Sequence, residues 1–130
     1  MMANNLWTLG HLFEKTEWIQ NARQQLANVY DGMEMYGSGY SNWAMLLLNN
    51  VTPFYEVVLA GKNDEMQKIW LNHYLPNTLT AYSSEEIPLG KFKNASESLI
   101  YVCSEENGCL PPFSDLNDVL EIVNLSFENK

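Results

Sequence analysis

The feature that most constrains the fold of this chain is a change of hydrophobic period within the stretch YSNWAMLLLNNVTPFYEVVLAG. In its first half the apolar residues Trp43, Leu46 and Leu47 recur at helical spacing. Pro53 ends that pattern, because proline lacks an amide donor and favours extended geometry in the residue before it. The aromatic and β-branched run that follows predicts a buried strand ending at Gly61. A helix leading into a central strand is therefore the expected core of the fold.

The first thirty residues carry an apolar stripe at helical spacing, formed by Trp18, Ala22, Leu26 and Val29. The stripe predicts one helix, or two, ending at Asp31-Gly32, where a glycine follows the last periodic residue. Its width indicates packing against other helices, foremost the helix predicted from about Ser41 to Val51. The glycine-rich segment between the two is expected to be a flexible connection.

The rest of the chain alternates strand and helix patterns. It predicts a strand at Phe54–Ala60, then a helix capped by Asn63 with Met66, Ile69, Trp70 and His73 on one face, then a strand at Thr78–Ser83. A polar loop at 84–97 and a strand at Ser98–Ser104 are expected to follow. The chain is then expected to turn at Asn107-Gly108, to pair briefly at Cys109-Leu110, and to end in a helix capped by Ser114 or Asp115. A strand, a crossover helix and a second strand form a βαβ unit, which implies parallel pairing.

The predicted fold class is therefore α/β. We expect a small, mostly parallel sheet of three to four strands with helices packed on it, preceded by an N-terminal helical pair. The chain is expected to be a single domain over residues 1–130, with the helical pair in 1–51 and the α/β portion in 52–130.

Charge and hydropathy exclude several classes of partner. The formal net charge is -9, with 3 basic against 7 acidic residues in 1–65 and 4 against 9 in 66–130. This spread acidity disfavours nucleic acid and anionic membranes, which require basic patches. The apolar residues 45–48 are followed by two asparagines, far short of the roughly 20 residues of a membrane span. No signal peptide is visible, so we expect a soluble, cytoplasmic protein.

Cys103 and Cys109 are separated by a predicted turn. Three interpretations are open: two structural thiols, a reversible disulfide across a hairpin, or part of a metal site. The spacing is not that of a CxxC motif, so a thioredoxin-type mechanism does not apply. The only histidines, His11 and His73, are distant in sequence, and we expect neither a metal nor a cofactor.

Four further residues are candidates for a pocket. His73 lies on the predicted apolar helix face and is a packing residue or an acid–base group. Glu56 interrupts an apolar strand; if buried, its carboxylate is a site candidate, but we favour a half-exposed strand with Glu56 pointing to solvent. Tyr40 and Trp43, with Trp70, form either core or a platform for a sugar.

Three motifs in order resemble a known family. They are YSNWAMLLLNNVTPFYEVVLAG, then Leu-Pro-Asn before a short strand, then IYVCSEENGCLPPFSD. The chain resembles, from about Phe13 onward, the C-terminal end of the large thioredoxin-domain-containing proteins of the spermatogenesis-associated and bacterial YyaL type. The matching residues are Pro53, Tyr55, Glu56, Val57, Val58 and Gly61, then Tyr101, Val102, Cys103, Cys109 and Pro111.

The resemblance implies that the chain corresponds to the last one or two helices of an (α/α) toroid, like that of N-acylglucosamine 2-epimerases and six-hairpin glycosidases, plus a terminal α/β portion. It implies a carbohydrate-related or redox-related context. The expected function is a non-catalytic packing or docking domain. Its partner would be the rest of a larger parent protein, or a second copy, held through the Trp18–Val29 face. The alternatives are a thiol–disulfide redox partner acting through Cys103 and Cys109, and part of a carbohydrate-related enzyme.

Overall fold

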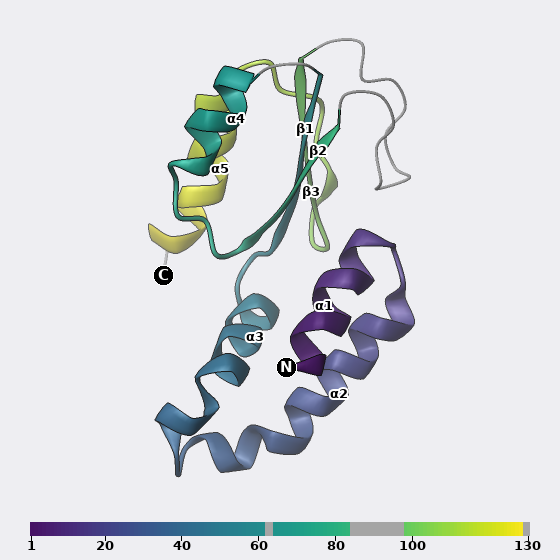
Figure 1. Cartoon of the computed structure of the whole chain (residues 1–130), viewed down its shortest axis with the longest axis vertical. Coiled ribbons are helices and arrows are strands. Elements are labelled where there is room, and N and C mark those ends of the chain that lie inside the picture. Colours follow the sequence, from purple (N-terminus) through teal and green to yellow (C-terminus); the bar gives the residue numbers. More distant parts are fainter. Residues whose placement is uncertain (62–63, 84–97, 129–130) are drawn as a thin grey trace. The chain divides into compact units, whose positions relative to one another are not determined.

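The computed structural model describes residues 1–61, 64–83 and 98–128, and the chain divides into two compact units, Met1–Thr52 and Pro53–Lys130 (Figure 1). The predicted Asn63 cap and the predicted polar loop at 84–97 lie outside the described residues.

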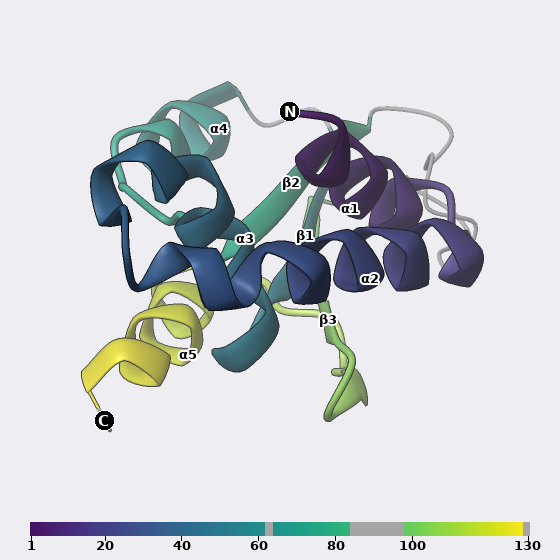
Figure 2. The ribbon, with the colours of Figure 1, turned by 90° about the horizontal axis from the view of Figure 1, so that it is seen from below.

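The first unit is helical, with α1 at Met2–Leu12, α2 at Thr16–Met33, a short 3-10 helix η1 at Gly37–Tyr40, and α3 at Ser41–Val51. The first thirty residues thus form two helices, joined by a turn in which Glu14 has a φ of 55°. Helix α1 lies along α2 (Figure 2). Gly10 permits this close approach, because a Cβ there would lie 2.7 Å from Ile19 Cγ1.

Arg23 connects the three helices of this unit. Its guanidinium carbon lies 5.4 Å from the ring centroid of Trp7 in α1, a cation–π distance. Its Nε donates a 2.9 Å hydrogen bond to Asn50 Oδ1 in α3. The Asn50 amide in turn donates to the Leu46 carbonyl at 2.8 Å. A single cation on α2 therefore joins an aromatic ring on one neighbouring helix to a side-chain amide on the other.

Helix α2 continues one residue past the predicted stop at Asp31-Gly32. The role of Gly32 is close contact, because a Cβ there would lie 3.0 Å from the Tyr40 hydroxyl oxygen. The connection expected to be flexible contains the 3-10 helix η1, in which the Gly39 N–H donates to the Tyr36 carbonyl at 2.9 Å.

The second unit is an α/β sandwich of two layers. Its elements are β1 at Tyr55–Ala60, α4 at Asp64–Leu71, β2 at Thr78–Ser83, β3 at Leu99–Ser104, β4 at Gly108–Cys109 and α5 at Leu116–Glu128. The strand order is β2-β1-β3-β4. The predicted α/β class is confirmed, and β1 and β2 are parallel as the βαβ pattern predicts.

The prediction of a mostly parallel sheet is wrong. Strand β3 pairs with β1 in the antiparallel sense, and β4 pairs with β3 likewise. The α4 crossover returns the chain to the end of the sheet at which β1 begins, so β2 runs parallel to β1. Strand β3 instead enters on the other side of β1 from the opposite end, and the following turn is too short for anything but a hairpin.

Helices α4 and α5 cover one face of this sheet (Figure 1). The core between them consists of Tyr55, Val57, Leu59, Trp70, Ile100, Val102, Leu116, Val119, Leu120 and Val123. Because side chains alternate along a strand, Glu56, Val58 and Ala60 lie on the opposite face of β1. These residues are buried too, so β1 is the buried central strand that its sequence predicts.

Two predicted end signals of this unit are present. Gly61, which follows β1, has a φ of 91°, a conformation that glycine adopts without strain. The Asp115 carboxylate accepts a 2.9 Å hydrogen bond from the Asn117 N–H, which makes it the N-cap of α5.

Candidate functional site

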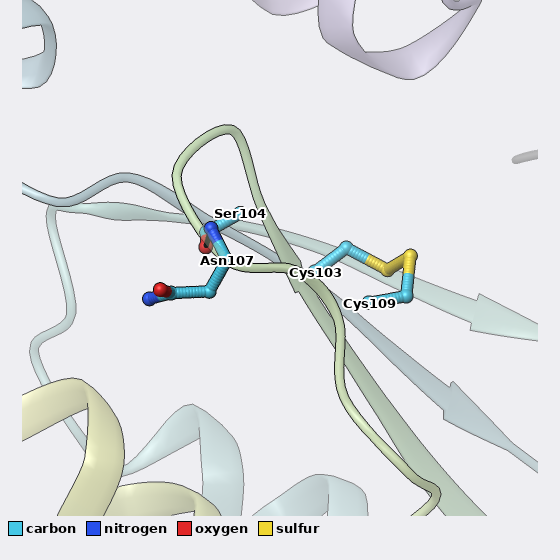
Figure 3. Close-up of a disulfide and its surroundings, with 4 residues drawn as sticks. All are labelled: Cys103, Ser104, Asn107 and Cys109. Carbon is cyan, nitrogen blue, oxygen red and sulfur yellow. Dashed lines mark hydrogen bonds between the residues drawn. A yellow bond between two sulfur atoms is a disulfide. The ribbon is translucent and has the colours of Figure 1, made fainter.

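The candidate site is the hairpin of β3 and β4, in which Cys103 and Cys109 form a disulfide (Figure 3). Their Cα atoms are 4.0 Å apart. The neighbouring pair makes the backbone hydrogen bond between the strands, in which the Leu110 N–H donates to the Val102 carbonyl at 2.9 Å. Cys103 and Cys109 are therefore a non-hydrogen-bonded pair, the antiparallel position in which opposing side chains come closest. The two sulfurs are bonded, so the interpretation as separate structural thiols is wrong.

The turn that brings the cysteines together is built by Ser104 and Gly108, which are paired at its base. Gly108 has a φ of 65°, so the predicted Asn-Gly signal marks the point where the turn ends and β4 begins. The Asn107 N–H donates to Ser104 Oγ at 3.2 Å, and the turn also exposes Glu105 and Glu106. Figure 3 shows the side chains of Ser104 and Asn107 on one side of the hairpin and the disulfide on the other.

The two cysteines differ in exposure. Cys103 is 2% exposed, whereas Cys109 on the short outer strand is exposed. A nucleophile from solvent therefore reaches Cys109 first. Its attack at the Cys109 sulfur would expel the Cys103 sulfur into a site closed to water.

Glu56 lies next to this disulfide. It is the cross-strand partner of Cys103, which is in turn the partner of Cys109, so the three residues form a row across β1, β3 and β4 on one face of the sheet. Opposing Cβ atoms in such pairs are about 5 Å apart. Glu56 is 7% exposed, so the preferred prediction that it points to solvent is wrong. The reason is that β1 is the central strand of the sheet and is buried along its whole length.

The other predicted pocket residues are not part of this row. Tyr40 and Trp43 belong to the first unit, where both are half-buried. His73 is exposed and lies beyond the end of α4. The helix ends there because the Asn72 and His73 N–H groups turn back to the carbonyls three residues earlier, at 3.2 and 3.1 Å. His73 is thus not the buried packing residue that the predicted face indicated.

A second feature of this unit was not predicted. A pocket of about 350 Å³ is lined by Trp70, Leu71, His73, Leu75, Thr78, Thr80 and Tyr82. The Trp70 indole N–H donates to Thr80 Oγ1 at 3.0 Å. Partial burial raises the pKa of the Tyr82 phenol above its usual value of 10.0. The available signal was the alternation of Thr78, Thr80 and Tyr82, which places all three on one face of a strand.

His73 and Glu56 lie on opposite faces of the sheet. The pocket residues of β2 pair with Tyr55, Val57 and Leu59, which face the helices, whereas Glu56 faces away from them. No acid–base pair between His73 and Glu56 follows from this arrangement.

The Trp18–Val29 face is buried in large part. Ile19, Ala22 and Leu26 are buried, and Trp18 and Val29 are half-buried. None of the described helices is long and apolar enough to cross a membrane. In the described part of the chain no three His, Cys, Asp or Glu residues are grouped so as to hold a metal ion.

No protein-family model, curated protein or solved structure matches the chain.

Proposed function

We propose that the chain is a thiol–disulfide exchange partner and that the Cys103–Cys109 disulfide is its reactive group. One observation carries the proposal: the two cysteines are bonded at the end of a hairpin, with Cys109 exposed and Cys103 buried. This asymmetry gives the two sulfurs different roles. Cys109 is the attacked sulfur and Cys103 is the leaving and resolving sulfur.

The reaction balances with a thiol partner. A partner thiolate attacks the Cys109 sulfur, a new S–S bond forms, and the electron pair of the broken bond goes to the Cys103 sulfur. A second partner thiol then attacks the mixed disulfide and releases Cys109 as a thiolate. The chain gains two electrons and two protons, and the partner becomes a disulfide. The reverse sequence oxidises the chain.

Glu56 supplies the proton transfer that the buried Cys103 requires. Water reaches Cys103 poorly, so the thiolate formed there needs a nearby proton donor, and the thiol needs a base before it can attack. Glu56 is the cross-strand neighbour of Cys103, which supports this role. Glu56 is therefore the positioning and proton-transfer residue of the pair, while the sulfurs carry the covalent chemistry.

The proposed exchange reaction fits a location in the cytoplasm. Cytosolic thiols are normally kept reduced, and a disulfide there is transient and responds to redox conditions. We therefore propose that the chain acts in the cytoplasm. The redox context that the resemblance to thioredoxin-domain-containing proteins implies agrees with it.

The test is to trap the intermediate. The oxidised chain is mixed with reduced glutathione, quenched with acid, alkylated and mapped by mass spectrometry. We expect glutathione on Cys109 and the alkyl group on Cys103. Glutathione on Cys103, or a disulfide that does not react with glutathione at all, would contradict the assigned roles.

The role of Glu56 is tested with matched variants. In Glu56→Gln, re-formation of the disulfide from the Cys109 mixed disulfide should slow by at least about 10-fold at neutral pH, because the amide cannot accept the proton. The difference from the parent chain should shrink at alkaline pH, where hydroxide removes the proton of the Cys103 thiol. Glu106→Gln removes the same charge at the exposed turn and should react like the parent chain. Equal rates in both variants would remove Glu56 from the mechanism.

A second function, docking to a larger parent protein, is favoured by one surface. Met45, Leu48 and Val51 are exposed and lie at helical spacing on α3. We propose this stripe, with the partly covered Trp18–Val29 face, as the packing surface of a non-catalytic domain. A strictly monomeric chain that binds no dye for apolar surface would argue against docking and would leave the redox proposal untouched.

A further inference from the structure

The open edge of the sheet is β2. In the described part of the chain β2 pairs with β1 on one side and with no strand on the other. The strand TLTAYS has six residues and contains no charged residue and no proline. Charged residues and prolines are the features by which proteins usually protect an exposed edge against pairing, and β2 lacks both. Strand β2 is therefore competent to accept another strand.

The hydrogen-bond pattern shows which backbone groups face the open side. The Tyr55 N–H donates to the Asn77 carbonyl at 2.9 Å, so Asn77 and every second residue after it face β1. The backbone groups of Thr78, Thr80 and Tyr82 consequently face outward. The Thr78 N–H is used by the Leu75 carbonyl at 3.2 Å. The outward row therefore offers alternating donors and acceptors at a spacing of about 6.6 Å, twice the rise of a strand residue.

The same three residues line the pocket between β2 and the end of α4. Thr78, Thr80 and Tyr82 form its floor, and Trp70, Leu71 and His73 form the helix side. Leu71 of this helix side is largely exposed. A strand added to β2 would thus place alternate side chains over a groove that is lined by both apolar and polar side chains, and contacts to such alternate side chains give specificity in β-strand addition.

We propose that the groove between β2 and α4 binds an extended, basic peptide segment of another protein by strand addition. Only an extended backbone matches the outward row of donors and acceptors. The unit Pro53–Lys130 has 5 lysines against 12 acidic residues, a net charge of -7. This negative charge favours a positively charged peptide. The same charge makes two copies of the unit repel each other, which favours a foreign peptide over self-pairing.

The experiment selects peptides from a phage-displayed library of random sequences of about nine residues, enough to span the six residues of β2. Affinities of the selected peptides are then measured with two variants of the full chain. Tyr82→Ala removes the side chain and keeps the outward N–H. Tyr82→Pro also removes that N–H, at an edge position where no bond to β1 is lost.

Strand addition predicts selected peptides that alternate apolar residues with lysine or arginine. They should bind Tyr82→Pro at least about 10-fold more weakly than Tyr82→Ala, because one pairing bond is lost and the ring obstructs the added strand. Equal affinity for the two variants, or no selected peptide, would overturn the proposal. A dimer of the parent chain that Tyr82→Pro dissociates would overturn it in favour of a second copy.

A second measurement does not depend on the variants folding. Each selected peptide is synthesised with N-methyl groups on either its odd or its even amides. An added strand bonds β2 through alternate amides only, so one methylated form should lose binding and the other should keep it. Equal behaviour of the two forms would exclude strand addition.

Discussion

The two edges of the sheet in the second unit are built in opposite ways. The β4 edge has two residues, is fastened to β3 by a disulfide, and runs into Pro111-Pro112. The β2 edge has six residues with no charge, no proline and no covalent bond to its neighbour. The β4 edge is closed to further pairing, whereas the β2 edge has no neighbouring strand among the described residues.

The two edge strands are held in the sheet in different ways, one by a covalent bond and the other by hydrogen bonds and packing. A two-residue strand has too few ladder bonds to persist by itself, and the disulfide holds it in place. That bond is also the group that can react. Strand β2 is held by its pairing with β1 over six residues and by packing against α4, from which the Trp70 indole N–H donates a hydrogen bond to Thr80. Its outer side pairs with no strand in the described part of the chain, so we propose chemistry at one edge and binding at the other.

The largest expected effect comes from removing the support of the open edge. Trp70 is 4% exposed, and its indole bonds Thr80 across the pocket. Trp70→Ala should lower the free energy of unfolding by about 3–5 kcal/mol, because it leaves a cavity and an unpaired hydroxyl group. Urea unfolding followed by circular dichroism measures the loss. Trp43→Ala, at a half-buried tryptophan of the first unit, should cost less, and an equal loss would contradict the assigned role of Trp70.

A smaller effect is expected from opening the closed edge. Replacing both Cys103 and Cys109 by serine removes a crosslink with a sequence separation of 6. The chain-entropy model gives a loss of about 2 kcal/mol for a loop of this size. The parent chain under strong reductant should unfold at the same urea concentration as the double variant. An unchanged midpoint in both would mean that β4 stays in place without the bond.

The smallest effect concerns pH. The pKa of Tyr82 is raised by burial, so its contribution to stability is fully present below about pH 10 and is lost as pH rises through the folded-state pKa. Tyr82 is 39% exposed, so solvent screening reduces the contribution. Tyr82→Phe should therefore lose slightly less stability than the parent between neutral and strongly alkaline pH. A steeper alkaline loss in the variant would contradict the direction.

Local signals predicted much of this fold. The Pro53 break, the glycine after β1, the Asp115 cap and the Asn107-Gly108 turn each act within a few residues, so the sequence alone reveals them. The sense of pairing of β3 was mispredicted because it depends on which side of β1 the chain returns to. That choice is made by packing over the whole unit and leaves no periodic mark in the strand itself.

The candidate site was predicted in part for the same reason. Cys103 and Cys109 are close in sequence, and a hairpin signal lies between them. Glu56 is distant in sequence, and its place beside Cys103 follows from a register that no local pattern encodes. His73 was misplaced because its helical spacing continues for two residues after α4 has ended.

The most direct test of the account is the redox equilibrium of the Cys103–Cys109 pair. The full chain is equilibrated in buffers of stepped ratios of reduced to oxidised glutathione, its free thiols are alkylated, and its intact mass is measured. The account predicts a single two-electron transition within the range of the buffers, in which both thiols appear together and no singly alkylated form accumulates. A pair that stays oxidised in fully reduced glutathione, or stays as two thiols in fully oxidised glutathione, would contradict it.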